Sequence, residues 1–283
     1  MNSEFAVRSM RPGELELVLE WARQEGWNPG LDDSLAFLEA DPSGFFVGAI
    51  GEVPVGSISV VKYGESFAFL GLYIVHPDFR GKGYGKAIWQ AGIASAGDRT
   101  IGLDGVAAQQ DNYRKAGFEP AYSTIRYGGV ANSLPVSTLV AQPVLDSRLE
   151  GLQRYDSVIF PQPRDAFLAA WCTGRKGRRS VVVRKSGKIR GYGTIRRCYE
   201  GYKIGPLFAN DADSAAALLA GLIPEAKGAA TVFIDIPTAN HEAVALAEGL
   251  GLKPVFETTR MYRGPAPAIP LKHVFGVTTL ELG

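Results

Sequence analysis

The sequence has few of the residues that build metal centres, disulfide frameworks and membrane spans. Its 283 residues include three histidines and two cysteines, and Cys172 and Cys198 have neither a CxxC spacing nor clustered histidines near them. We therefore expect free, mostly buried thiols and no bound metal. No apolar run approaches the roughly 20 residues that a membrane-spanning helix needs, and the first residues are polar. A soluble, cytoplasmic protein that does not enter a membrane is expected.

The length of the chain predicts two domains. A domain usually has roughly 100–200 residues, so 283 residues suggest two of similar size. Hydrophobic residues make up 46% and charged residues 21%, which is enough for a packed core in each half. Residues 1–140 hold 11 Lys/Arg against 16 Asp/Glu, and residues 141–283 hold 19 against 13, so the halves carry −5 and +6. Opposite charges favour an interface between the halves, or a basic half that helps to hold an anion.

The basic segments of the chain do not predict nucleic-acid binding. They are residues 175–179, Arg-Lys-Gly-Arg-Arg, and the pair Arg196-Arg197. A short basic loop before a strand is usually solvated, so we expect no nucleic-acid partner. The sequence leaves the oligomeric state open, with a homodimer as one outcome.

The most informative segment is a glycine-rich turn between an apolar strand and a helix. Residues 67–75 predict a buried strand, and residues 86–94 place apolar side chains at helical spacing. At a helix start the first N–H groups have no intrahelical partner and the dipole is positive, so this turn predicts an anion site. Glycines let the backbone approach an oxyanion closely. The turn consists of Arg80, Gly81, Lys82, Gly83, Tyr84, Gly85 and Lys86.

Spacing narrows the kind of anion that this turn binds. A P-loop needs Gly-Lys-Ser/Thr, but Ala87 follows Lys86, so no hydroxyl is available for magnesium. A dinucleotide-binding turn needs Gly-x-Gly-x-x-Gly, and the glycines at 81, 83 and 85 do not fit that spacing. Nucleotide hydrolysis and dinucleotide binding are therefore disfavoured, while a glycine-rich turn without a ligand stays open.

Two segments together resemble the GNAT N-acetyltransferase superfamily. Residues 80–85 have the form Arg-x-x-Gly-x-Gly, which resembles the superfamily motif that binds the pyrophosphate of acetyl-CoA. Residues 113–118, Tyr-Arg-Lys-Ala-Gly-Phe, are similar to its Tyr-x-Lys-x-Gly-Phe segment, in which a helix ends at a glycine before the next strand. The resemblance implies acetyl-CoA as co-substrate and no metal.

The resemblance also implies roles for individual residues. Tyr113 would act as general acid toward the departing thiolate, because a phenol with a pKa near ~10 can share its proton. A tyrosine ring packed against the cofactor is the alternative. A bulge in the strand before the turn would let the main chain of Tyr73, Ile74 and Val75 pair with the pantetheine arm. The turn from Arg80 to Lys86 would hold the pyrophosphate.

The acceptor side of the predicted site has weaker signals. Val106 stands where many superfamily members carry an asparagine, so that cofactor contact is not transferred. His76 and Asp104, each near the end of a strand, are candidates for the general base, and loss of the amine proton to water stays open. The loop between the first two helices usually contacts substrate in this fold, which points to Trp27 and Asn28. A tryptophan that closes the core is the alternative.

Apolar periodicity predicts helices and strands in the order that the resemblance implies. In the first half we expect helices or strands at 12–26, 32–40, 44–50, 55–63, 67–75, 86–96 and 100–103. In the second half we expect them at 163–172, 180–184, 188–196, 202–208, 211–222, 231–236 and 241–249. The resemblance implies an α/β (α+β) protein with two GNAT-like domains, each a mixed, mainly antiparallel sheet flanked by helices.

An internal repeat supports two copies of one fold. Residues 117–126 match residues 251–260 at a constant offset of 134, and glycine, proline, threonine and arginine coincide. A stretch with glycines and prolines but no clear period, 128–147, separates the copies. We therefore expect an N-terminal domain, a linker and a C-terminal domain, with the ranges 1–130, 131–147 and 148–283.

The second copy lacks both the anion-binding turn and the tyrosine. Residues 209–214, Ala-Asn-Asp-Ala-Asp-Ser, follow the strand that corresponds to 67–75 and contain neither arginine nor a glycine pair. Their two aspartates suit a helix start but would repel a pyrophosphate. Asn240 keeps the superfamily asparagine, whereas Ala247 replaces the tyrosine. We therefore expect a degenerate C-terminal domain that shapes the substrate pocket or the assembly.

These observations predict an acetyl-CoA-dependent N-acetyltransferase with one working site, in the N-terminal half. A primary amine of a small molecule or a peptide would attack the thioester directly. Two alternatives remain: a non-catalytic acyl-CoA-binding or regulatory module, and an acyltransferase for longer acyl groups.

Overall fold

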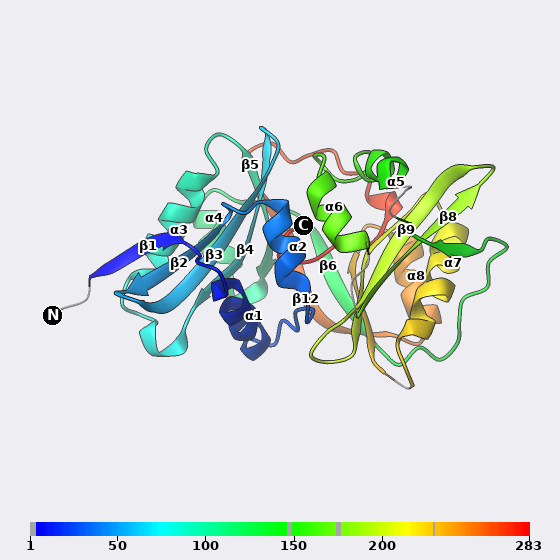
Figure 1. The fold of residues 1–283 in the computed structure, drawn as a ribbon, viewed down its shortest axis with the longest axis horizontal. Helices are drawn as coiled ribbons and strands as arrows, with labels where there is room; N and C mark the ends of the chain where they lie inside the picture. The colour runs from blue at the N-terminus through cyan, green and yellow to red at the C-terminus, as the bar shows by residue number, and fades with distance from the viewer. Residues whose placement is uncertain (1–3, 146–148, 174–176, 229) are drawn as a thin grey trace.

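The computed structural model describes residues 4–145, 149–173, 177–228 and 230–283 (Figure 1). The first half contains ten helices and strands within these ranges. They are β1 (Phe5–Ser9), α1 (Glu14–Gln24), α2 (Asp33–Ala40), β2 (Phe45–Ile50), β3 (Val53–Tyr63), β4 (Phe67–Val75), α3 (Tyr84–Ser95), β5 (Thr100–Val106), α4 (Gln110–Lys115) and β6 (Glu119–Gly129). Every predicted segment of this half is confirmed within a few residues. β1, with its short edge sequence Phe-Ala-Val-Arg-Ser, had no sequence signal.

The second half repeats this order and adds one strand, β13, at its end. Its elements are β7 (Ala141–Pro143), α5 (Leu149–Asp156), α6 (Asp165–Cys172), β8 (Arg178–Lys185), β9 (Lys188–Arg197), β10 (Tyr202–Ala209), α7 (Ala212–Leu222), β11 (Val232–Pro237), α8 (His241–Gly249), β12 (Lys253–Arg263) and β13 (Val274–Gly276). The predicted segments are again confirmed. The sequence did not reveal β7 or β13, since three residues are too few for a period to show, and it did not reveal α5.

One continuous sheet runs through both halves. In the described chain its order is β1-β2-β3-β4-β5-β12-β6-β11-β10-β9-β8-β7, and β13 pairs with β10 beside this row. The β4–β5 and β10–β11 pairs are parallel, whereas the other neighbours are antiparallel. The fold is therefore α/β with a mixed, mainly antiparallel sheet flanked by helices, as the sequence predicted.

The two halves exchange their last strands. β6 pairs with β11 of the second half, and β12 pairs with β5 of the first half, while β6 and β12 pair with each other at the centre of the molecule (Figure 1). The predicted linker, 131–147, includes β7, which pairs with β8 at the far edge. The division into two domains at this place stays a prediction.

Helices cover both faces of the sheet and form separate cores. On one face a single cluster joins both halves: it includes Leu15 of α1, Phe37 of α2, Trp171 of α6 and Leu282 near the C-terminus. Phe37 and Trp171 stack with ring centroids 6.4 Å apart, so α2 packs against α6. On the other face α3 and the pair α7–α8 cover one half each. None of the described helices is long and apolar enough to cross a membrane.

Two reciprocal ion pairs fasten the exchanged strands. Arg126 of β6 donates through Nε and Nη2 to both carboxylate oxygens of Asp235 on β11, at 2.6 and 3.0 Å. Arg260 of β12 donates in the same way to Asp104 of β5, at 2.9 Å for both bonds. In each pair the arginine lies directly opposite its aspartate in the strand register. These are the arginines that coincide in the sequence repeat.

A third buried charge cluster joins the halves through α2. Asp33 contacts Arg178 at 2.9 Å and Arg196 at 3.2 Å, and all three side chains are at most 3% exposed. Burial alone would raise the pKa of Asp33, but Arg196 and Arg178 outweigh it and hold the pKa below its ordinary value. Arg178 belongs to the basic run 175–179, of which residues 175 and 176 lie outside the described part of the chain.

Removal of Asp235 should destabilise the protein strongly. In Asp235→Ala the guanidinium of Arg126 stays buried without its bidentate partner, which typically costs about 3–5 kcal/mol of folding free energy. Urea denaturation followed by circular dichroism measures this loss. The matched control is Glu150→Ala, which removes the exposed partner of Arg154 and should cost at most about 1 kcal/mol. Equal losses in the two variants would contradict the role of the buried pair.

Candidate active site

A bulge separates β4 from β5 and opens the sheet. The parallel pairing of the two strands ends at Leu70 and Leu103. On its other edge β4 shifts register against β3 between Ser57 and Ser59, which gives β4 one extra residue. Leu72 lies at this bulge, with a left-handed φ of 46° and a buried side chain. Because a bulge bends its strand, the last five residues of β4 diverge from β5.

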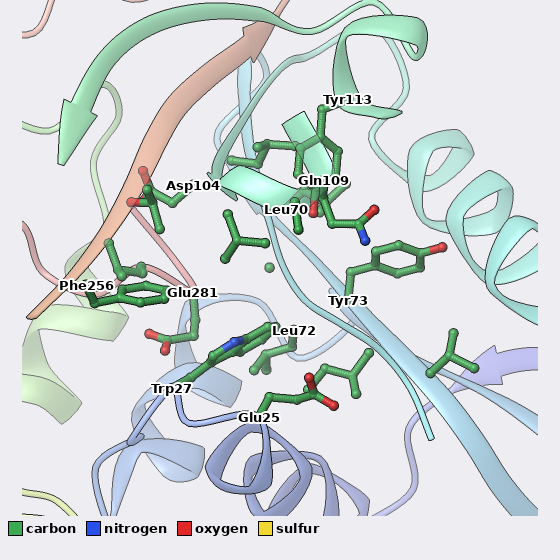
Figure 2. Close-up of a pocket in the computed structure, with 18 of the residues that line it drawn as sticks. Glu25, Trp27, Leu70, Leu72, Tyr73, Asp104, Gln109, Tyr113, Phe256 and Glu281 are labelled. Carbon is green, nitrogen blue, oxygen red and sulfur yellow. The ribbon is translucent and has the colours of Figure 1, made fainter. Parts of the chain in front are cut away.

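A cavity of about 460 Å³ occupies the resulting cleft (Figure 2). From the first half it is lined by Glu25, Trp27, residues 70–75, Arg80, Leu103, Asp104, Val106, Ala108, Gln109, Tyr113 and Arg126. From the second half it is lined by Phe256, Thr258, Leu280 and Glu281. Both halves therefore build its wall.

The glycine-rich turn stands at the mouth of this cleft, before α3. Gly81 and Gly83 have left-handed φ angles of 75° and 86°, and neither would bring a Cβ within 4 Å of another atom. Gly85 packs against β4, since a Cβ there would lie 2.9 Å from the Tyr73 hydroxyl. No acceptor pairs with the backbone N–H groups of residues 81–85 in the described chain. These groups at a helix N-terminus form a ready anion site.

Arg80 bridges the turn, β4 and α1. Its Nε donates to the carbonyl oxygen of Val75 at 2.8 Å, and its Nη2 contacts the carboxylate of Glu25. The Arg80 side chain is still half exposed. A guanidinium at this place adds positive charge beside the turn, and the Glu25 carboxylate compensates part of that charge.

Tyr113 lies on the opposite wall of the cavity, in an aromatic and apolar setting. Its ring stacks on Trp89 with centroids 5.6 Å apart and packs over Gly105, where a Cβ would lie 3.0 Å from the ring. Burial raises the pKa of Tyr113 to about 12. The phenol is therefore protonated at neutral pH and is available as a proton donor.

The other end of the cavity is built around Trp27. The Trp27 carbonyl oxygen accepts hydrogen bonds from Arg126 at 3.1 Å and from the buried Lys203 at 2.9 Å. Arg126 also lies over the ring of Phe256, 5.4 Å from its centroid. In Figure 2 Trp27, Phe256 and Glu281 are on one side of the view, while Tyr73, Gln109 and Tyr113 are on the other. The cavity thus runs from a tyrosine-lined wall to an aromatic end with the carboxylates of Asp104 and Glu281 (Figure 2).

Comparisons with known proteins agree with this geometry. A family model described as "Acetyltransferase (GNAT) family" matches residues 14–118, and one described as "Acetyltransferase (GNAT) domain" matches residues 152–276. The chain is 33% identical to the holothin acyltransferase of Pseudoalteromonas sp. (strain SANK 73390), over 100% of this chain and 97% of that protein.

The chain belongs to the GNAT acetyltransferase family.

Solved structures show the same fold. A putative acetyltransferase from Pyrococcus horikoshii superposes with a TM-score of 0.81 at 23% identity, over 99% of this chain and 96% of that one. A tandem GNAT protein from the clavulanic acid biosynthesis pathway superposes with a TM-score of 0.62 at 18% identity, over 93% and 100%. The present chain is a tandem GNAT protein and a transferase, since its full-length relative is an acyltransferase and both halves match the family.

The residues that the sequence singled out in this GNAT protein do not all reach the cavity. Trp27 and Asp104 line it, but Asp104 is held by Arg260 through both carboxylate oxygens. Asn28 bonds through its side chain to the backbone of Glu200 in the second half, and it is not among the lining residues. His76 packs beside Trp21 outside the cavity wall.

Of the predicted cofactor residues, some line the cavity and others form the turn at its mouth. Tyr73, Ile74, Val75 and Arg80 line it, while residues 81–86 lie in the turn and the first turn of α3. Tyr113 lines the cavity as well. The described structure brings these residues to one cleft, and their roles stay predictions.

Sequence reasoning missed Glu25, Gln109, Phe256, Leu280 and Glu281 as lining residues. Phe256 belongs to the repeat segment 251–260 of the second half. Its position in the cavity of the first half could be predicted only with knowledge that the halves exchange strands. Glu281 has no neighbouring motif at all. A short C-terminal segment that crosses to another site carries no local signal.

The second half of the GNAT protein has an equivalent splay, filled by its own C-terminal segment. Parallel pairing of β10 and β11 ends at Ile204 and Ile234, and β10 has a register shift before Leu207. β13 pairs with β10 in the gap, and the Val277 N–H donates to the Asp235 carbonyl oxygen of β11 at 2.9 Å. The C-terminal segment, residues 274–277, therefore lies as a third strand between β10 and β11.

Two polar residues, Asn240 and Asp211, distinguish this second cleft from the first. The Asn240 side chain donates to the carbonyl oxygens of Leu271, Lys272 and Val274 at 3.3, 3.2 and 3.0 Å. At the start of α7, Asp211 accepts from the Ser214 N–H at 2.8 Å, so a carboxylate caps the helix where the first half has the glycine turn.

The raised pKa of Tyr113 predicts a measurable titration. Between about pH 9 and pH 11, ultraviolet titration curves of the wild type and of Tyr113→Phe should coincide, because this phenol ionises only near pH 12. In denaturant the curves should differ by one phenol with an ordinary pKa near ~10. A difference of one phenol in the folded proteins below pH 11 would show that the Tyr113 ring is not desolvated.

Proposed function

We propose that the protein transfers an acetyl group from acetyl-CoA to a primary amine of a small molecule or a peptide, in the cleft of its first half. Two neighbouring features carry this proposal. Strands β4 and β5 splay apart, and at the mouth of the cleft between them lies a turn whose backbone N–H groups have no acceptor in the described chain. An extended acyl-CoA needs both features, because its pantetheine arm adds to a strand edge and its pyrophosphate needs donors.

The donor would lie along the predicted residues. The backbone of Tyr73, Ile74 and Val75 is the strand edge that pantetheine would use beyond the bulge, and residues 80–86 would supply N–H groups and three positive charges for the pyrophosphate. Arg80 would exchange Glu25 for phosphate when the donor binds.

Tyr113 is the proposed general acid. As the amine nitrogen attacks the thioester carbonyl carbon, the C–S bond breaks and sulfur takes a proton from the phenol. Tyr113 is protonated at neutral pH and can therefore donate, while burial makes its phenol a weaker acid than that of a free tyrosine.

The acceptor would bind at the Trp27 and Phe256 end of the cavity. The volume of about 460 Å³ lies within the range of small-molecule sites, which favours a small amine over a long peptide. The full-length relative is named for acylating holothin, so holothin is the first acceptor to assay. The same assay should include acetyl-CoA and acyl-CoA donors with longer chains. Several of the lining residues are leucines, which can contact an acyl chain longer than acetyl.

We also propose a division of labour between the predicted domains, 1–130 and 148–283. The first binds the donor, and the second supplies Phe256, Thr258 and Glu281 to the acceptor side. The cleft of the second half would bind no acyl-CoA, because β13 pairs with the strand edge that pantetheine would need.

Acetyl-CoA should bind once per chain and only at the first cleft. Isothermal titration should give a stoichiometry near one, and acetyl-CoA should raise the melting temperature of the wild type. The double variant Arg80→Glu with Gly83→Asp places two carboxylates at the anion site and should abolish both effects. Arg184→Glu, on β8 of the second half, is the matched charge control and should keep them. Protection that survives in the double variant would move the site elsewhere.

Replacement of Tyr113 by Phe should slow transfer without weakening donor binding. Loss of a general acid typically costs about 10²–10⁴ in kcat. Thiol release from acetyl-CoA, in the presence of an amine that the wild type acetylates, measures kcat. Calorimetry measures the affinity for acetyl-CoA. A rate within a few fold of wild type would leave Tyr113 as a packing residue beside Trp89.

A further inference from the structure

The carboxylate of Glu281 faces the cavity without a partner. Glu281 is only 4% exposed and lines the cavity. In the described chain no hydrogen bond or ion pair joins its carboxylate to another side chain, whereas its backbone N–H donates to the Thr279 hydroxyl at 3.3 Å. The carboxylate oxygens are not fully buried and Glu281 lines the cavity, so a carboxylate that no described side chain contacts at this wall points to a group that the cavity receives.

The other carboxylates of the wall are already engaged. Glu25 contacts Arg80 at the mouth, and Asp104 holds Arg260 through both oxygens. Among the described lining residues Glu281 is therefore the carboxylate that is free to meet an incoming amine.

The backbone of Glu281 is fixed beside the bulge of β4. It packs directly against Gly71, where any Cβ would collide with the Glu281 carbonyl oxygen. The tail is tied down on both sides: the Thr279 hydroxyl accepts from the Leu282 N–H at 2.9 Å, and the Tyr63 hydroxyl donates to the Leu282 carbonyl oxygen at 3.0 Å. Leu282 itself is fully buried. The carboxylate is therefore held at the point where β4 leaves β5.

Charged groups from four strands surround Glu281 beyond contact distance. Arg126 of β6, Arg196 of β9 and Lys203 of β10 attract it, and Asp104 of β5 repels it. Burial and Arg126 together lower the pKa of Lys203 to about 8, while Glu281 acts in the opposite direction. The cations balance a negative charge on Glu281 without occupying its oxygens.

We propose that Glu281 accepts the proton that the acceptor amine loses as it attacks the acyl donor. This inference rests on the proposed function. The amine nitrogen forms a bond to the thioester carbonyl carbon, the C–S bond breaks, the nitrogen gives one proton to the Glu281 carboxylate, and sulfur gains one from Tyr113. Solvent then returns a proton to Tyr113 and removes one from Glu281. The second half thus contributes a catalytic residue to the site of the first.

The test compares Glu281→Gln and Glu281→Asp with the wild type and a control. Glu257→Gln is that control: Glu257 is exposed on β12, between lining residues that point the other way. Thiol release is followed with acetyl-CoA and water as acceptor, and with every amine that the wild type acetylates, over the pH range in which the protein is folded. Melting curves with and without acetyl-CoA check folding and donor binding.

Glu281→Gln, which keeps the shape of the side chain, should lower thiol release by about 10²-fold or more. Its melting temperature and its protection by acetyl-CoA should not change, and Glu281→Asp, which keeps a carboxylate, should retain more of the rate than Glu281→Gln. A rate of Glu281→Gln within about threefold of the Glu257→Gln control, or equal losses in Glu281→Gln and Glu281→Asp, would overturn the assignment. Failure of the proposed function would appear separately, as a wild type that acetyl-CoA does not protect.

Discussion

The reciprocal ion pairs Arg126–Asp235 and Arg260–Asp104 are the constraint on which the arrangement of the two halves depends. Each pair is buried and joins a strand of one half to a strand of the other, directly opposite in register. A one-residue slip of β6 or β12 would turn every side chain of that strand to the other face and leave the arginine and the aspartate of its pair buried without each other, which is far more costly than a simple loss of contact. The pairs therefore specify which strands exchange and in what register, and the exchange carries Phe256 and Thr258 of β12 to the cavity of the first half.

A single device, a bulge that splays two parallel strands, has opposite consequences in the two halves. In the first half the gap between β4 and β5 beyond Leu70 is occupied by the cavity. In the second half the gap beyond Ile204 holds β13, and Asn240 binds the carbonyl groups of the incoming segment. The backbone edge of β10 pairs with β13, whereas in the described chain no strand pairs with the edge of β4 that faces β5 beyond Leu70. Asp211 completes the difference, because its carboxylate neutralises the helix start that the glycine turn leaves open.

Local patterns predicted most of the elements, and they singled out several residues that line the cavity, whose role in donor binding stays a prediction. The turn at residues 80–86 and the segment around Tyr113 are contiguous in sequence, and a contiguous pattern keeps its meaning wherever the strands pair. The exchange of β6 and β12 was not predictable, because swapped and unswapped sheets use the same strands with the same buried faces. The repeat did align Arg126 with Arg260, yet equal arginines say nothing about which half supplies the aspartate. For the same reason Asn28, which sequence reasoning placed at the substrate, binds Glu200 of the other half instead.

The C-terminal segment occupies the cleft of the second half and also supplies a residue to the cavity of the first half. β13 ends at Gly276, and Glu281 lies five residues further, a distance of at most about 18 Å for an extended chain. Glu281 can reach Gly71 only if β13 is anchored near the centre of the molecule, and the gap between β10 and β11 is the anchor that the fold offers. A second half that still bound a ligand in that gap would displace β13 and withdraw Glu281 from the cavity. The filling of the second cleft and the placing of Glu281 at the first cavity therefore depend on the same segment of the chain, residues 274–281.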